Sequence, residues 1–173
     1  YSRTQLVDEG LGYDADRVVV YLRNLRVFLV VDSIKVTRSS WFTFANLWHT
    51  REIVEHQGSS FLTRYDRVGG ENLPTGTKLN IVFPDVWGEK APGTFPINRH
   101  GQEEVAIYQS VSGSFKPGDR QSFVTVLHPI REGESLAEFR DSVHLVDSDR
   151  PHDGVAVEFV AGGKAHLVCI KTN

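Results

Sequence analysis

Arg17-Val-Val-Val-Tyr-Leu-Arg23 and Arg26-Val-Phe-Leu-Val-Val-Asp-Ser-Ile-Lys35 are two runs of β-branched and aromatic residues, separated only by Asn24 and Leu25. Such residues are enriched in strands, and two such runs around a short polar break are typical of a β-hairpin. We therefore predict an antiparallel hairpin over residues 17–35, and the rest of the fold is worked out from it.

Further runs of the same character follow the hairpin at the spacing expected of an all-β protein. They cover 41–49, 59–63, 79–83, 105–111, 122–128, 154–160 and 165–170. Helical signals are weak throughout, and the best candidate, at 135–140, is too short for a helix that is stable alone and is equally compatible with a strand or a loop. Short strands joined by turns need a second sheet over their apolar face. Residues 1–173 are therefore predicted to form a single all-β domain, an antiparallel two-sheet β-sandwich with long loops.

The stretch from 84 to 104 is the least strand-like part of the chain and is rich in proline. It contains Trp87, Arg99 and His100, and it is long for a connection inside a compact domain. Connections of this length are often functional or mobile, and both interpretations stay open for this stretch. Glu103 and Glu104 at its end are interpreted as solvated ends of strands.

Charge and composition argue against two classes of partner. The formal net charge is −3 and the pI is about 6.2, so the basic excess of a nucleic-acid-binding domain is missing. The sequence has no run of about 18 uncharged apolar residues, so no membrane-spanning helix is predicted. Arginine supplies 13 of the 19 basic residues, and its fork suits carboxylate and sulfate groups, which is compatible with an acidic ligand.

The single cysteine and the missing methionine are the other informative features of composition. Because Cys169 is the single cysteine of the sequence, no internal disulfide can form. It lies in the apolar run at 165–170, so a buried thiol is predicted. The sequence contains no methionine, even at its first position, so we expect it to be a segment of a longer chain or a processed product.

Short motifs for catalysis or metal binding do not occur in this sequence. There is no Gly-rich phosphate loop, nucleophile elbow or His-Glu-x-x-His segment. No two of the seven histidines have the spacing that would place both on one strand or helix face. The acidic stretch 147–153 fails the EF-hand pattern and is interpreted as turn chemistry. We therefore assign no catalytic residue and no metal ligand from the residues themselves.

The tryptophans are the best candidates for carbohydrate binding, because an indole face stacks on the apolar face of a sugar ring. Trp41 and Trp48 are seven residues apart, so in a regular strand they face opposite sides and at least one belongs to the core. Trp87 is the better candidate for exposure. We predict a carbohydrate site at Trp87, Arg99 and His100, with Trp48 and His49 as further candidates.

Four segments together resemble the C-terminal β-region of heparinase II/III-like polysaccharide lyases. They are Arg17-Val-Val-Val-Tyr21, Val27-Phe-Leu-Val-Val-Asp32, Phe44-Ala-Asn-Leu-Trp-His49 and Phe123-Val-Thr-Val-Leu-His-Pro129. The resemblance covers about residues 15–130 and, more loosely, 154–170. It implies that the parent enzyme cleaves uronate-containing acidic polysaccharides by β-elimination, and that it is secreted or periplasmic.

In that family the catalytic Tyr and His come from an N-terminal helical toroid and from segments of Gly-His-x-His and His-Asn-Thr type, which also serve a zinc ion. Neither segment occurs in this sequence, and only the Trp48-His49 element matches a family motif. The resemblance therefore implies no cofactor within residues 1–173, with zinc held elsewhere in the parent enzyme.

Three functions follow as hypotheses. The leading one is the non-catalytic sandwich of a lyase, which packs against an N-terminal catalytic domain of the same chain and lines the cleft for an acidic polysaccharide. The second is a stand-alone carbohydrate-binding module with its site at Trp87, Arg99 and His100. The third is a mutarotase-like sugar isomerase, which would need a histidine and a carboxylate that converge in one pocket.

Overall fold

The structure is a computed structural model that describes residues 1–64, 67–68, 71–72, 78–84, 90–99, 101–131, 133–146, 154–161 and 163–172. Strands dominate this part of the chain, and the sequence-based prediction of an all-β antiparallel fold is confirmed. In chain order the elements are β1 (Ser2–Asp8), β2 (Tyr13–Leu22), β3 (Val27–Val36), β4 (Ser40–Thr50), β5 (Glu52–Gln57), β6 (Ser60–Arg64), β7 (Arg67–Val68), β8 (Glu71–Asn72), β9 (Lys78–Val82), β10 (Gly93–Arg99), β11 (Gln102–Phe115), β12 (Arg120–Ile130), α1 (Leu136–Asp141), β13 (Val143–Val146), β14 (Gly154–Ala161) and β15 (Lys164–Lys171).

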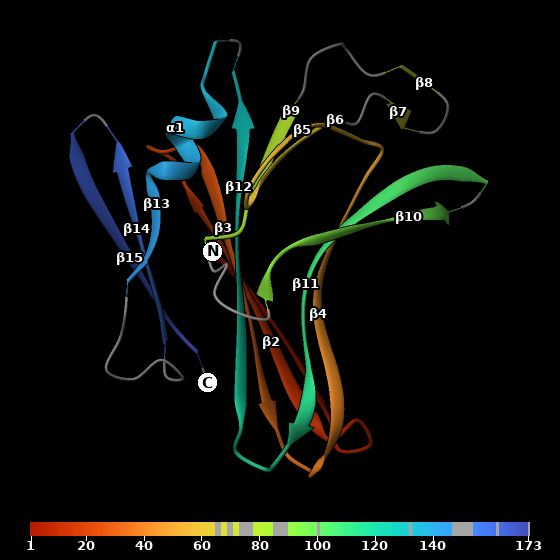
Figure 1. Cartoon of the computed structure of the whole chain (residues 1–173). Helices are drawn as coiled ribbons and strands as arrows, with labels where there is room; N and C mark the ends of the chain where they lie inside the picture. The colour runs from red at the N-terminus through yellow and green to blue at the C-terminus, as the bar shows by residue number, and fades with distance from the viewer. Residues whose placement is uncertain are drawn as a thin grey trace.

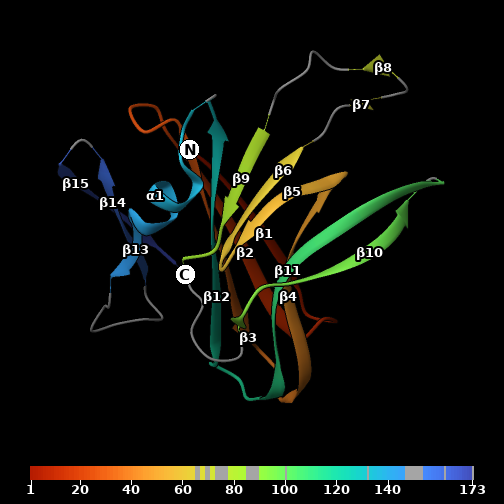
Figure 2. The same cartoon turned by 45° about the horizontal axis from the view of Figure 1, so that its top comes forward.

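The strands form three layers (Figure 1). The middle layer, called the central sheet, has seven antiparallel strands in the order β1-β2-β3-β12-β9-β6-β5. One of its faces is covered by the sheet β10-β11-β4, called the β4 sheet, and the other by the sheet β13-β14-β15, called the β14 sheet (Figure 2). The short strands β7 and β8 pair with each other. The sandwich is therefore built on a central sheet that is packed on both faces.

The hairpin predicted over 17–35 forms as β2 and β3. Its strands pair in register from Tyr13 opposite Val36 to Leu22 opposite Val27. The turn between them is closed by bonds from the Leu25 amide to the Leu22 carbonyl and from the Arg26 amide to the Arg23 carbonyl. Arg26 has a φ of 55°. This left-handed conformation is uncommon for a residue other than glycine, and here it belongs to the tight turn. The prediction from β-branched and aromatic runs is confirmed.

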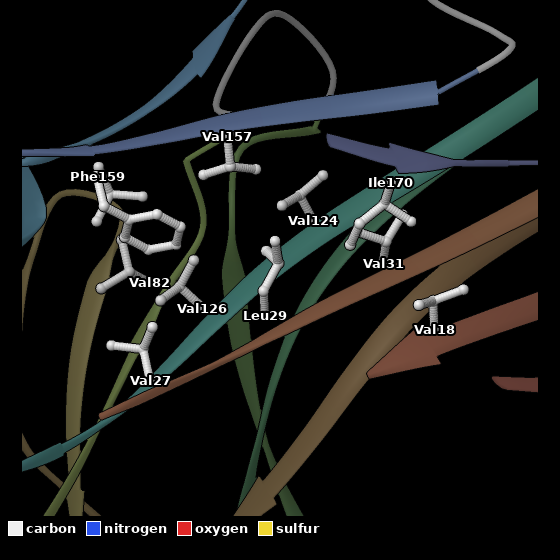
Figure 3. Close-up of a cluster of buried hydrophobic side chains, with 11 residues drawn as sticks. Val18, Val27, Leu29, Val31, Val82, Val124, Val126, Val157, Phe159 and Ile170 are labelled. Atoms are coloured by element: carbon white, nitrogen blue, oxygen red, sulfur yellow. The ribbon is translucent and has the colours of Figure 1, made fainter. Parts of the chain in front are cut away.

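Strand alternation explains why both faces of the central sheet are apolar. On the face toward the β14 sheet, one cluster joins side chains of the two sheets, and Figure 3 shows them pointing toward one another. Its buried members are Val18, Val27, Leu29, Val31, Val82, Val124, Val126, Val143, Val157, Phe159 and Ile170. On the opposite face, two clusters pack against the β4 sheet. They consist of Ile34, Val36, Phe44, Phe115 and Phe123, and of Phe61, Ile81, Phe83 and Ile107.

Two sequence-based predictions are wrong. Residues 93–99 are strand β10 and β11 begins at 102, so 84–104 is not one continuous loop; within it, 85–89 and 100 lie outside the described residues. Cys169 is exposed, because on β15 the neighbouring Ile170 takes the inward position. The acidic stretch 147–153 also lies outside the described residues.

Candidate functional site

Trp48 and His49 are neighbours in sequence but leave β4 on opposite faces. Trp48 is opposite Ile107 and packs inward against the cluster of Phe61, Ile81, Phe83 and Ile107, whereas His49 is opposite Ala106 on the outer face. Trp41 is 68% exposed and also faces outward, as the spacing of seven predicted. The structure therefore does not bring Trp48 and His49 together in one site.

Trp48 is held between the β4 sheet and the central sheet. Its Nε1 donates to Thr125 Oγ1 at 3.2 Å, and Asn46 Nδ2 donates to the same hydroxyl at 2.8 Å. The Arg17 guanidinium lies 5.6 Å from the centre of the indole ring. Arg17 also binds Asp32 through two bonds of 2.5 and 2.9 Å. Trp48 is thus a partly buried link between the layers.

His49 faces a carboxylate on the adjacent strand. His49 Nδ1 lies 3.8 Å from Glu104 Oε2, and Arg51 Nε lies 3.9 Å from Glu104 Oε1. Glu104 is only 9% exposed, so its interpretation as a solvated strand end is wrong. The nearly buried Glu104 carboxylate thus has a guanidinium and an imidazole beside it. We call His49, Arg51 and Glu104 the outer-face site.

Apolar side chains border the outer-face site. Phe95, Ala106 and His49 lie side by side across β10, β11 and β4. Phe95 is 40% exposed and its ring centre is 5.5 Å from that of Tyr108, while Leu47 on β4 is 41% exposed. Imidazole and guanidinium donors beside exposed apolar surface suit a sugar, which has polar edges and apolar ring faces.

The other predicted carbohydrate residues are only partly placed. Arg99 is the exposed last residue of β10, opposite Gln102 at the tip of the β10–β11 hairpin. By strand alternation it shares the outer face with Phe95. Trp87 and His100 lie outside the described residues. The sequence-based prediction missed Glu104. The one available signal was strand alternation on β11: Glu104 is two residues from Ala106 and so lies on the same face, and Ala106 is opposite His49.

A second histidine and carboxylate pair lies beneath α1. His128 Nε2 is 3.6 Å from Glu134 Oε2, and Arg26 Nη2 donates to Glu134 Oε1 at 2.6 Å. His128 and Glu134 both line a cavity of about 500 Å³. The imidazole, however, is 5% exposed and stacks on Phe139 with ring centres 3.9 Å apart. The pair thus meets the convergence that an isomerase would need, but its buried ring is placed to anchor α1.

Burial lowers the pKa of His128 below its ordinary value, Glu134 acts in the opposite direction, and Arg26 adds to the lowering. The Glu134 carboxylate accepts from the Arg131 amide, which lowers the pKa of that carboxylate, and its bond from Arg26 has the same effect. His128 is therefore held neutral beside an ionised Glu134 at neutral pH.

Among the described residues no group of three or more His, Cys, Asp or Glu side chains is arranged to hold a metal ion. In the residues that the structure describes, no helix has the length and apolar character needed to cross a bilayer.

The fold and the outer-face site together define the class: an all-β antiparallel sandwich with an exposed sheet face that carries an imidazole, a guanidinium and apolar side chains. Models of known protein families give no match to the chain, and neither do curated proteins. Solved structures do. Two structures of the heparan sulfate lyase HepC from Pedobacter heparinus match 93% of this chain at 14% identity, with TM-scores of 0.61 and 0.62. A heparinase III structure matches the same share at 15% identity, with a TM-score of 0.52.

The likeness is one of fold, and it covers a part of those proteins. The chain spans 24% of the length of each of these lyase chains. The resemblance to heparinase II/III-like lyases that the sequence suggested is thus confirmed in the architecture of the β-sandwich.

Proposed function

We propose that this chain is the non-catalytic β-sandwich part of a polysaccharide lyase that acts on uronate-containing acidic polysaccharides. In this proposal it supports the catalytic part of the enzyme, and the outer face of the β4 sheet lines the glycan cleft. The fold likeness to heparan sulfate lyases over 93% of the chain supports the class of enzyme. The outer-face site supports the place of contact, because His49 and its apolar neighbours Phe95 and Leu47 are exposed.

The chemistry of β-elimination explains why we assign a binding role. The reaction needs a group that neutralises the uronate carboxylate, a base for the α proton and an acid for the leaving oxygen. His49 and Arg51 offer hydrogen-bond donors for carboxylate or sulfate oxygens. Glu104 already faces both of them, so it orients these side chains. This set supplies recognition of an anionic sugar and leaves the proton transfers to the catalytic part.

The position of His49 is the main support for this proposal. His49 lies on the exposed face, its Nδ1 faces Glu104, and the apolar Phe95 lies two strands away. Calorimetry with a heparan sulfate hexasaccharide tests the site. We expect His49→Ala to weaken binding about tenfold, the loss of one charge-assisted hydrogen bond. Thr43→Ala is the matched control, because Thr43 is exposed on the same strand and face, six residues away. Equal affinity of all three proteins, or no binding by the wild type, would contradict the proposed site.

The non-catalytic role has a separate test. Incubation of the 173-residue chain with heparan sulfate, followed by the ultraviolet absorbance of the unsaturated uronate product, is expected to show no turnover. Sustained turnover that His49→Ala abolishes would overturn this assignment and make His49 a catalytic residue.

A further inference from the structure

The central sheet and the β4 sheet, which pack against each other, differ greatly in size. The central sheet has seven strands and the β4 sheet has three. β4 packs over β2, β3 and β12: Phe44 contacts Tyr13, Asn46 and Trp48 bond Thr125, and Trp48 meets Arg17. β4 is the edge strand of its sheet, so the part of the central sheet beyond it, around β1, has no covering strand within the described residues.

A groove of about 510 Å³ runs along this step between the layers. Its floor comes from three strands: Thr4 and Leu6 of β1, Tyr13, Ala15, Asp16 and Arg17 of β2, and Asp32, Ser33 and Ile34 of β3. The groove is continuous with the core, since Ile34, Phe44 and Phe123 belong both to its lining and to a buried cluster.

The wall of the groove comes from β4, through Thr43, Phe44 and Ala45. Within the described residues β4 pairs only with β11 and lies at the edge of its sheet, so its other edge borders the groove. An edge strand presents a row of unpaired N–H and C=O groups, which is a template for another strand.

The chemistry of the floor favours polypeptide over an anionic glycan. Leu6, Tyr13, Ala15 and Ile34 are apolar or aromatic, and in a second layer they would pack against every second side chain of an added strand. Among the described residues that line the groove, the exposed cation Arg17 is already bound by Asp32 through two hydrogen bonds, and the Asp16 carboxylate is paired with Arg3. These lining residues thus offer no unneutralised charge for a sulfate or carboxylate.

We infer that an extended strand from the rest of the lyase polypeptide pairs with the free edge of β4 and covers the groove above β1, β2 and β3. This rests on the proposed function, and the source fits the comparison, since the matched part is only 24% of the solved lyase chains. The added strand continues the β4 sheet and closes the sandwich on its open side.

Leu6 and Val7 provide a matched pair of variants. Both are exposed residues of β1, at 49% and 71%, and they point to opposite faces of the strand. Leu6 lines the groove, so Leu6→Arg places a long charged side chain on its floor. Val7→Arg makes the same substitution on the other face. Far-ultraviolet circular dichroism of both variants establishes that each is folded.

Hydrogen exchange of the β4 amides, compared between the 173-residue chain and the full-length polypeptide that contains it, tests the inference. In the short chain every second β4 amide, the set not paired with β11, exchanges fast; in the full-length protein the same amides exchange at least about tenfold more slowly. Leu6→Arg in the full-length protein restores fast exchange, and Val7→Arg does not.

Other outcomes overturn the inference. Equal exchange in both proteins means that no strand docks. If the β4 amides of the 173-residue chain are already protected and sedimentation shows that this chain is a dimer, a second copy of the chain occupies the groove. If protection appears only after a heparan sulfate hexasaccharide is added, a glycan occupies the groove. Lyase turnover by the full-length protein is measured in parallel: turnover with unprotected β4 amides refutes the docking alone, whereas protection without turnover refutes the proposed function alone.

Discussion

Gly93 lies where the outer face of the β4 sheet has no room for a side chain. It begins β10 opposite Tyr108, whose ring lies across the glycine: a Cβ built at Gly93 would meet Tyr108 Cζ at 2.8 Å and the phenolic oxygen at 2.9 Å. Because Tyr108 also packs on Phe95, the glycine indirectly sets the position of the apolar border of the outer-face site.

We expect Gly93→Ala to destabilise the protein by about 1–3 kcal/mol, the usual cost of overpacking, because the Tyr108 ring has to move. Gly113→Ala on β11 is the control, since a Cβ there meets nothing closer than Phe115 Cε2 at 3.9 Å. Urea unfolding of the two variants measures the difference. Equal free energies of unfolding would show that the Tyr108 ring moves aside without cost.

Residue-level predictions from the sequence succeeded where alternation alone decided the answer. The spacing of Trp41 and Trp48 placed one on each face of β4, and the structure agrees. The same rule, applied to adjacent residues, separates Trp48 from His49. Glu104 could not be chosen as the partner of His49, because that requires the register between β4 and β11, which are more than fifty residues apart in the chain.

At the scale of elements, all nine strands predicted from apolar runs are present. The strands that were not predicted are β7 and β8, of two residues each, and β1, β5, β10 and β13, each of which lies at the edge of its sheet. β1 is exposed along its whole length, β5 and β10 are mostly exposed, and β13 has only four residues. Strands at sheet edges bury little side-chain surface, so their sequences lack the apolar alternation that marks a core strand.

The helix α1 shows how an element with little stability of its own is held by tertiary contacts. Its six residues are too few for a stable isolated helix. The Ser135 hydroxyl accepts a bond from the Glu138 amide at its N-terminus, and Phe139 stacks on the buried His128 ring. The pair of His128 and Glu134 then ties the segment to Arg26 in the β2–β3 turn.

This anchoring predicts a pH-dependent stability. Burial lowers the pKa of His128 from 6.5 in the folded protein. As pH falls below about 6.5 the unfolded chain takes up a proton that the folded protein does not, so the free energy of unfolding decreases. Above that pH the imidazole is neutral in both states and the effect is absent. One proton limits the slope to about 1.4 kcal/mol per pH unit.

Urea unfolding between pH 7.5 and 5.5 measures this dependence, and His128→Gln is expected to flatten it. The window stays above the range in which Glu134 takes up a proton, since the pKa of that carboxylate is lowered from 4.5. His144→Gln, at an exposed position on β13, serves as the control and should keep the wild-type slope. A slope unchanged by His128→Gln would contradict the assigned cause.

For the whole molecule, the sequence predicted a two-sheet sandwich, and the structure shows a central sheet with a partner on each face. Strands β2, β3 and β12 carry apolar residues at inward positions for both sides, such as Val31 toward the β14 sheet and Ile34 toward the β4 sheet. Nearly continuous apolar runs are expected of strands buried on both faces. The run Val27-Phe-Leu-Val-Val in β3 therefore indicates a strand that is covered on both faces, as in a three-layer fold, and not only the presence of a strand.

Because the central sheet is shared by both cores, the two sides should unfold as one cooperative unit. Phe159 is buried in the core toward the β14 sheet, and Phe159→Ala is expected to cost about 3–5 kcal/mol. Trp48 lies on the opposite side of the sheet, so in a background that carries Trp41→Phe and Trp87→Phe its fluorescence reports the other core. The urea midpoint measured by fluorescence should shift with the variant as much as the midpoint measured by circular dichroism. If the fluorescence midpoint stayed at the wild-type value, the cores would unfold independently, and the central sheet could not be the structural link between the β14 sheet and the outer-face site.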